Sequence, residues 1–367
     1  MPDTWNSIGR RAFLQGGVAA TALTLPHAAA QTPQILNRQP GMKYRPLGAT
    51  GHYLSEISLG GLVSVESVLH YGIDKGVNLV HVAEDYLGGR SIVTLGNVLQ
   101  TKRDKVYIAL KDDFSSIDSA LRQLHTDHVD FVMFNRHSAG AAADPSIAET
   151  FEKYRKAGKV RFAGLTSHSG VKEATAAGIR SGMYTLVMPA LNQPSFEAMD
   201  AELRAAHEKG IGVMPMKTMR GLRNPQLEAA YLKKLLANPA ITTVVKGIGS
   251  FEMFDRYLKA LNEPLAMAED DALYRHAQAN RAQNCMMCGE CHAACPEGID
   301  VPAILRAHDY YHGQLGDFAT ALATWRGLDS ARTGSAACRD CTRCERACPN
   351  GLRIVERLDA SRALFAV

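Results

Sequence analysis

The chain has 367 residues, of which 46% are hydrophobic and 21% charged, and its formal net charge is +4. This length and composition allow two or three folded domains with complete hydrophobic cores. The charge is mild and no block of Lys and Arg occurs, so the composition argues against a nucleic-acid-binding protein and indicates no other partner.

Residues 1–30 have the pattern of a secretory signal peptide. Arg10 and Arg11 precede Phe13-Leu14, a short apolar run follows from 18 to 25, and the alanines at 28–30 offer a cleavage site. Paired arginines before Phe-Leu resemble the signal that the twin-arginine export machinery reads. The apolar run is shorter than the about 20 residues needed to span a bilayer. We therefore expect export to the periplasm and no integral membrane span, the alternative being a disordered tail with a chance Arg-Arg.

Residues 31–42 are polar and contain proline, which indicates a linker. Residues 43–267 alternate β-rich runs with amphipathic helical runs, such as 147–157 and 227–236. The β-rich runs lie at 57–59, 78–82, 106–110, 131–134, 161–165, 185–190, 212–216 and 242–245. Eight such β-then-α units predict a (β/α)8 TIM barrel. A doubly wound open sheet is the competing fold, but the chain lacks the G-x-G-x-x-G turn typical of its dinucleotide-binding members.

Residues 268–367 are predicted to form a small α-helical ferredoxin-like domain, because all eight cysteines lie there in two similar runs. The runs are Cys285, Cys288, Cys291 and Cys295-Pro296, and then Cys338, Cys341, Cys344 and Cys348-Pro349. In two-cluster ferredoxins such a run binds one 4Fe–4S cluster with its first three cysteines, and its fourth ligates the other cluster. We therefore expect two 4Fe–4S clusters with crossed ligation, in which Cys348 completes the first run and Cys295 the second. Disulfides and zinc are the alternatives, although zinc sites usually pair two C-x2-C units.

Several segments of the predicted barrel resemble the aldo/keto reductase family. They include Tyr-Arg-Pro-Leu-Gly at 44–48, Gly-Val-Asn-Leu-Val at 76–80, Gly-Lys-Val-Arg-Phe-Ala-Gly at 158–164 and Val-Met-Pro-Met-Lys at 213–217. The resemblance covers the whole barrel, and the segment 295–302 resembles the subgroup with a C-terminal ferredoxin module. It implies reduction of a carbonyl by NADPH, in which a Tyr donates the proton, a Lys and an Asp set its acidity, and a His orients the carbonyl.

The resemblance places the proton donor at Tyr86 and the lysine at Lys111, where a strand ends. The chain departs from the family at two catalytic positions, since His81 replaces the Asp, and Asn135 replaces the His, with His137 two residues later. We take these five residues as the candidate catalytic group. A tyrosine that only packs at a strand end, or a histidine that only fills the core, is the structural alternative at each position.

The candidate cofactor-binding residues are Ser167, His168, Lys217, Gly249 and Ser250. The family's Ser-Asn that holds the nicotinamide becomes Ser167-His168, the neighbouring Gln becomes Met188, and the Glu-Asn at the adenine end becomes 256–257, Arg-Tyr. These substitutions affect both ends of the cofactor, so NADP(H) is a doubtful cofactor in this chain. Lys217 and Ser167 could instead only line the barrel mouth.

Three functions follow from these patterns. The first is an iron–sulfur oxidoreductase that acts on a small carbonyl-type substrate at the barrel mouth, with electrons passed through two clusters from a redox partner protein or a quinol-linked donor. The second is an NADPH-dependent aldo/keto reductase with an accessory ferredoxin module. The third is a non-catalytic electron-transfer protein.

Overall fold

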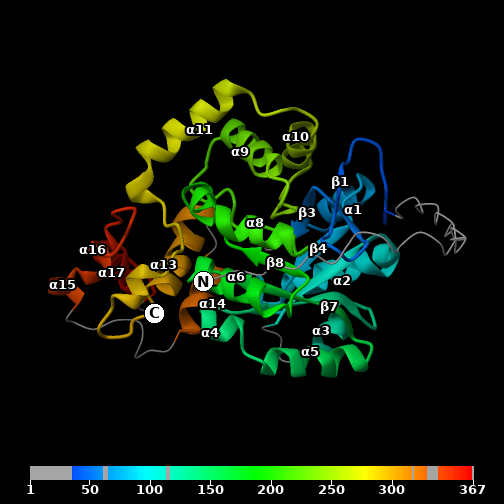
Figure 1. Cartoon of the computed structure of the whole chain (residues 1–367), viewed down its shortest axis with the longest axis horizontal. Coiled ribbons are helices and arrows are strands. Elements are labelled where there is room, and N and C mark those ends of the chain that lie inside the picture. Colours follow the sequence, from blue (N-terminus) through cyan, green and yellow to red (C-terminus); the bar gives the residue numbers. More distant parts are fainter. Residues whose placement is uncertain (1–34, 61–64, 113–115, 316–317, 329–337, 366–367) are drawn as a thin grey trace, which may run out of the picture. The chain divides into compact units, whose positions relative to one another are not determined.

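The computed structural model describes residues 35–60, 65–112, 116–315, 318–328 and 338–365. Residues 33–367 form one compact unit, and Figure 1 follows this chain from the blue N-terminal hairpin to the red C-terminal helices. The predicted signal peptide and residues 31–34 of the predicted linker lie outside the described residues. No helix within the described ranges is both long enough and apolar enough to cross a membrane.

Eight parallel strands form a closed barrel. They are β3 (Ile57–Gly60), β4 (Leu79–Val82), β5 (Tyr107–Lys111), β6 (Val129–Asn135), β7 (Val160–Ser167), β8 (Leu186–Pro189), β9 (Gly212–Val213) and β10 (Val244–Lys246). The sheet order is β10-β3-β4-β5-β6-β7-β8-β9. The Thr242 N–H donates to the Val213 carbonyl at 2.8 Å and the Val245 N–H to the Pro215 carbonyl at 3.2 Å, which closes the sheet between β9 and β10. The predicted (β/α)8 barrel is confirmed.

The strands read as continuous apolar runs because both of their faces are covered. Leu79, Val80 and Val82 in β4 are at most 2% exposed, and Ile108 and Leu110 in β5 are fully buried. Such two-sided burial is typical of parallel sheets in which helices cover the outer face. The polar candidates His81, Lys111, Asn135 and Ser167 stand at or near the carboxyl ends of their strands, and the barrel topology therefore brings them to one mouth.

Helices cover the outside of the barrel (Figure 1). They are α1 (Glu66–Asp74), α2 (Arg90–Lys102), α3 (Ile117–Gln123), α4 (Ala139–Ala142), α5 (Ser146–Lys156), α6 (Val171–Ser181), α7 (Gln193–Phe196), α8 (Asp200–Glu208), α9 (Pro225–Ala237) and α10 (Phe251–Leu261). Their starts follow local sequence rules. The Asn224 side chain accepts from the backbone N–H groups of residues 226 and 227, and Pro225 begins α9.

An antiparallel hairpin precedes the barrel, and the sequence patterns did not reveal it. It pairs β1 (Tyr44–Pro46) with β2 (Tyr53–Ser55). Arg45 attaches the hairpin to the barrel, since its guanidinium binds the Glu56 carboxylate at 2.7 Å and the Ile241 carbonyl at 3.1 Å. Three-residue strands are too short to show an alternating pattern, which explains why they were missed.

The C-terminal region, residues 268–367, is helical as predicted. Its helices are α11 (Met267–Ala279), α12 (Glu290–Ala293), α13 (Val301–Asp309), the π-helix η4 (Tyr310–Leu315), α14 (Phe318–Arg326), α15 (Cys338–Cys341), α16 (Arg343–Arg346) and α17 (Ile354–Phe365). Helices α13 and α17 share a small core built from Ile304, Leu305, Ile354 and Leu358, against which several cysteines pack. The boundary at residue 268 stays a prediction.

Candidate active site and cysteine clusters

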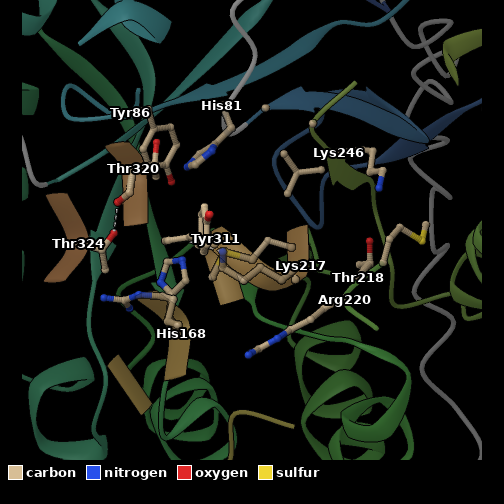
Figure 2. A pocket seen from close by; sticks show the side chains of 18 of the residues that line it. His81, Tyr86, His168, Lys217, Thr218, Arg220, Lys246, Tyr311, Thr320 and Thr324 are labelled. Atoms are coloured by element: carbon tan, nitrogen blue, oxygen red, sulfur yellow. Dashed lines mark hydrogen bonds between the residues drawn. The ribbon is translucent and has the colours of Figure 1, made fainter. Parts of the chain in front are cut away.

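The mouth of the barrel opens into a cavity of about 870 Å³, which we call the mouth cavity. The barrel contributes His81, Tyr86, Lys111, Asn135, His168 and Lys217 to its wall, and the C-terminal region contributes Arg306, Tyr310, Tyr311, Thr320 and Thr324. Several of these residues are drawn in Figure 2. Two parts of the chain that are distant in sequence therefore enclose one space.

Tyr86, His81 and Lys111 meet in this cavity. The ring centroids of His81 and Tyr86 are 5.9 Å apart, and the Lys111 Nζ lies 5.5 Å from the centroid of the Tyr86 ring. Figure 2 shows the two rings turned toward the same space, with His168 also pointing into it. A tight turn follows Tyr86, since Leu87 has a φ of 54° and two glycines with positive φ come next. The structure thus brings together the proton donor expected at Tyr86 and the two residues, Lys111 and His81, at the positions expected to set its acidity.

His81 is a neutral imidazole in this setting. It is 5% exposed, and burial, followed by the positive charge of Lys111, lowers its pKa from 6.5 to about 3. Its Nε2 atom has no hydrogen-bond partner among the described residues. A neutral imidazole can donate or accept a hydrogen bond, so it can orient a substrate oxygen, whereas the family's Asp would supply a negative charge.

Asn135 and His168 also line the mouth cavity, while His137 stands behind them. The His137 Nδ1 accepts a hydrogen bond from the His168 backbone N–H at 3.2 Å, and the two rings make an edge contact with centroids 5.8 Å apart. Burial, followed by Arg306, lowers the pKa of His137 to about 4, and burial also places the pKa of His168 well below its ordinary value. His137 therefore positions His168 and does not itself line the cavity.

The mouth cavity gathers polar atoms that lack partners. Within the described part of the chain, four buried side-chain atoms on its wall make no hydrogen bond, namely His81 Nε2, Asn135 Oδ1, His168 Nδ1 and Thr218 Oγ1. Buried polar groups are nearly always paired in folded proteins. Their convergence on one space indicates a site for a polar ligand.

The other cofactor candidates have local structural partners. The Ser167 hydroxyl donates to the Ser169 carbonyl at 2.8 Å, and the Ser250 Oγ caps α10 by accepting from the Met253 N–H at 3.2 Å. Gly249 precedes this cap, and none of the three lines the mouth cavity. Among the cofactor candidates, His168 and Lys217 alone contribute to the cavity wall.

The residues present do not offer the contacts by which the resembled family binds NADP(H). Met188 is fully buried and is absent from the cavity wall. Tyr257 is buried, and its hydroxyl donates a short hydrogen bond to Glu228. Burial, followed by Glu228, raises the pKa of Tyr257. This phenol is therefore a buried structural group that is already hydrogen-bonded within the protein. We derive no chemical step through NADP(H).

The second cysteine run and Cys295 surround a small apolar cavity. Cys295, Cys338, Cys341 and Cys344 line it together with Ile299, Val301, Val355 and Leu358. The guanidinium of Arg362 donates to the Cys338 Sγ at 3.4 Å. Four thiols around an apolar space, with a hydrogen bond to a sulfur, suit a 4Fe–4S cluster. Cys295 joins the second run here, which supports the crossed ligation that stays a prediction.

Cys348 accompanies the first run. Burial raises the pKa of the Cys288 thiol, and the nearby Cys285 and Cys348 thiols raise it further. Sulfur atoms again accept backbone hydrogen bonds, from the Met287 N–H to Cys285 at 3.3 Å and from the Leu352 N–H to Cys348 at 3.4 Å. None of the eight cysteines forms a disulfide. No group of three or more His, Cys, Asp or Glu among the described residues is gathered as for a single metal ion.

The two runs share an unusual backbone. The residue after the second cysteine has a positive φ in both, 91° at Gly289 and 47° at Thr342, and so does the glycine three residues after the fourth cysteine, 63° at Gly298 and 67° at Gly351. Left-handed residues turn the chain sharply and are costly for side chains other than glycine. The repeat seen in the cysteine spacing therefore extends to the loop conformation.

Arg220 connects the mouth cavity with the first cysteine run. It lines the cavity, its Nε lies 2.9 Å from the Asp309 carboxylate, and its positive charge interacts electrostatically with the Cys285 thiol. The first cysteine run has a second contact with the barrel, since the Asn192 Nδ2 donates to the Cys285 carbonyl at 2.8 Å. Arg220, Arg306 and Tyr310 were missed by sequence reasoning, because no local pattern marks a residue that reaches the site from another part of the fold.

Comparison with known proteins agrees with this geometry. Residues 63–243 match the model of the aldo/keto reductase family, and two models described as 4Fe-4S dicluster domains match residues 281–352 and 250–300. The uncharacterized oxidoreductase YqkF of Bacillus subtilis is 22% identical over 301 residues, which cover 65% of this chain and 97% of that protein. The methylglyoxal reductase YeaE of Escherichia coli is 27% identical over 110 residues, or 28% of this chain and 38% of that protein.

Solved structures share the barrel fold. The aldo-keto reductase AKR11C1 from Bacillus halodurans superposes with a TM-score of 0.51 at 19% identity, covering 64% of this chain and 96% of that one. A putative aldo-keto reductase from Pseudomonas aeruginosa has a TM-score of 0.51 at 21% identity, covering 59% and 95%. The chain is therefore an oxidoreductase whose residues 63–243 are similar to the aldo/keto reductase family and whose C-terminal region is similar to 4Fe–4S dicluster domains.

Proposed function

We propose that this protein reduces a small carbonyl compound in the mouth cavity with electrons delivered through two 4Fe–4S clusters. One observation carries the proposal. The barrel and the C-terminal region wall the same cavity, and Arg220 both lines it and interacts electrostatically with the Cys285 thiol. Bound clusters supply single electrons, and Cys285 belongs to the run that contacts the barrel.

The barrel residues supply the acid chemistry. Tyr86 donates a proton to the carbonyl oxygen, and the ammonium of Lys111, 5.5 Å from the ring centroid, stabilises the resulting phenolate. Neutral His81 gives the same oxygen a hydrogen bond that orients it. The unpaired Asn135 and His168 atoms hold other polar groups of the substrate.

The choice of electron donor can be tested directly. The anaerobically purified holo-protein is mixed with methylglyoxal or benzaldehyde, and with either reduced methyl viologen or NADPH. Methylglyoxal is included because one relative is named as its reductase. We expect consumption of the carbonyl with the viologen and no tight binding of NADPH. Low-micromolar NADPH binding with hydride transfer would establish an ordinary reductase, and inactivity with both donors would favour an electron carrier.

We also propose that the protein is exported to the periplasm through a twin-arginine signal at residues 1–30, where a redox partner protein or a quinol-linked donor reduces it. The support is the sequence pattern at Arg10 and Arg11. Replacing both arginines with lysine is expected to leave a precursor with intact clusters in the cytoplasm. Fractionation that finds the variant in the periplasm at the normal level would refute the signal.

A further inference from the structure

Reducing a carbonyl to an alcohol consumes two electrons and two protons. In a nicotinamide reaction the hydrogen that reaches carbon is a hydride, so one acidic residue is enough. If electrons come singly, as in the function proposed above, that hydrogen must arrive as a proton. The mouth cavity then needs a second acid, and the inference that follows rests on the proposed function.

Tyr310 and Lys217 form a second tyrosine–lysine pair in the mouth cavity. The Lys217 Nζ donates to the Tyr310 hydroxyl at 2.9 Å and lies 4.3 Å from the centroid of its ring. Both residues line the cavity, Lys217 from the barrel and Tyr310 from the C-terminal region. The pair repeats the chemistry of Tyr86 and Lys111, with a phenol beside an ammonium that can stabilise the phenolate.

The backbone on both sides of this contact is unusual. Lys217 has a φ of 54°, in the left-handed region, which is unfavourable for a residue other than glycine. Tyr310 begins the π-helix Tyr310–Leu315, where α13 ends. Strained residues and π-helical turns are concentrated at functional sites. The fold therefore maintains this contact at a cost to local conformation.

The surroundings of Tyr310 favour release of its proton. Burial raises the pKa of the phenol, but Lys217, Arg306 and Lys111 together outweigh burial, so the pKa lies below its ordinary value. The positive charge of Lys111 lowers the pKa of Tyr310, and the same ammonium lies 5.5 Å from the centroid of the Tyr86 ring. Both phenols are therefore influenced by one positive charge. The Tyr310 oxygen accepts from Lys217, and no acceptor within the described ranges takes its own hydrogen.

We infer that Tyr310 is a second catalytic acid, which protonates the carbonyl carbon while Tyr86 protonates the oxygen. The C=O π bond breaks, and one C–H bond and one O–H bond form. The substrate gains two electrons from a one-electron donor that is oxidised twice, and both phenolates regain protons from water. Lys217 is a positioning residue that holds the Tyr310 phenolate between turnovers.

Deuterium labelling tests this inference. The holo-protein is assayed in D2O with reduced methyl viologen and benzaldehyde, whose product carbon does not exchange with solvent. The wild type is expected to give benzyl alcohol with one deuterium on that carbon and a single handedness, because Tyr310 delivers it to one face. Tyr310→Phe keeps the ring and is expected to lower the rate by about 10²–10⁴-fold, and its residual product should be racemic at that carbon.

Three further variants separate acid catalysis from structural damage. Lys217→Met should also lower the rate of reduction and give a product without a single handedness. Lys217→Arg, which keeps the charge, should restore both the rate and the handedness in part. Tyr274→Phe removes a hydroxyl from a residue that is 62% exposed on α11 and should behave as the wild type. Iron content and the electron paramagnetic resonance spectrum of the reduced clusters should be unchanged in all four variants.

The outcomes distinguish the two proposals. A Tyr310→Phe variant whose product still carries deuterium with one handedness overturns the role of Tyr310 and leaves the proposed function intact. A wild type that consumes no benzaldehyde with the viologen, or that places no deuterium on carbon, overturns the proposed function itself.

Discussion

The neutral state of His81 makes the stability of the barrel depend on pH. Its pKa is 6.5 in an unfolded chain and about 3 in the folded protein, chiefly because of burial and then because of Lys111. Between these two pKa values, His81 is therefore protonated in the unfolded chain and neutral in the folded protein. The stabilisation is fully present above pH 6.5 and is lost as the pH falls from there toward 3.

The magnitude follows from these two pKa values. At about pH 5.5, protonation of the unfolded chain lowers the free energy of unfolding by about 1.4 kcal/mol, and at about pH 7 by about 0.2 kcal/mol. Acidification between these values should therefore cost about 1.2 kcal/mol through His81 alone. His137 and His168 add losses of the same sign, because their pKa values are also lowered.

The substitution His81→Gln isolates this contribution. Urea unfolding, followed by far-ultraviolet circular dichroism without oxygen, gives the free energy of unfolding of the wild type and the variant at both pH values. The wild type should lose about 1.2 kcal/mol more than the variant on acidification. His207→Gln, at an exposed residue of α8, controls for the chemical change. An equal loss in wild type and His81→Gln, or a larger loss in the variant, would refute a neutral buried His81.

Three other predictions concern the C-terminal region. The holo-protein should contain about eight irons, and Cys295→Ala should damage the cluster of the second run more than that of the first; the opposite pattern in electron paramagnetic resonance would contradict crossed ligation. Arg220→Met removes a buried cation that interacts electrostatically with Cys285 and should lower the reduction potential of the first cluster by roughly 60–130 mV in a redox titration, so an unchanged potential would exclude Arg220 from the electron path. Gly289→Ala places a methyl group 3.0 Å from the Gly170 nitrogen at a φ of 91°. It should lower the free energy of unfolding by about 1–3 kcal/mol more than Gly298→Ala, whose methyl group meets nothing within 4 Å. Equal thermal stability of the two variants would show that this contact is unimportant.

The barrel could be predicted because its signals are local. Each parallel strand is covered on both faces and so appears as an apolar run, and the helices between strands show the period of an amphipathic helix. Tyr86, Lys111 and His81 were placed together by the resemblance to the aldo/keto reductase family, and the strand end at Lys111 agrees with a position at the barrel mouth. The cysteine runs were equally clear, since their spacing alone suits cluster binding.

Other parts of the candidate site could not be found in this way. Ser250 was assigned to cofactor binding, but its oxygen caps α10, and His137 was assigned to catalysis, but it supports His168 from behind. The assignment of His137 came from its place two residues after the position of the family's His. A motif specifies the residue and its neighbours in sequence, whereas the direction of the side chain depends on packing around it.

The sequence by itself determined the eight strands of the barrel and the two cysteine runs, because each depends on residues close together in the chain, and its resemblance to the aldo/keto reductase family indicated the tyrosine and lysine at the mouth. Only the tertiary structure decided that Tyr310 and Arg306 complete the mouth cavity, that Arg220 reaches Cys285, and that Cys295 lies with the second run. These contacts join residues far apart in sequence. They exist only when the C-terminal helices pack against the barrel mouth, and the free energy of that packing is shared by many side chains, none of which carries a recognisable local pattern.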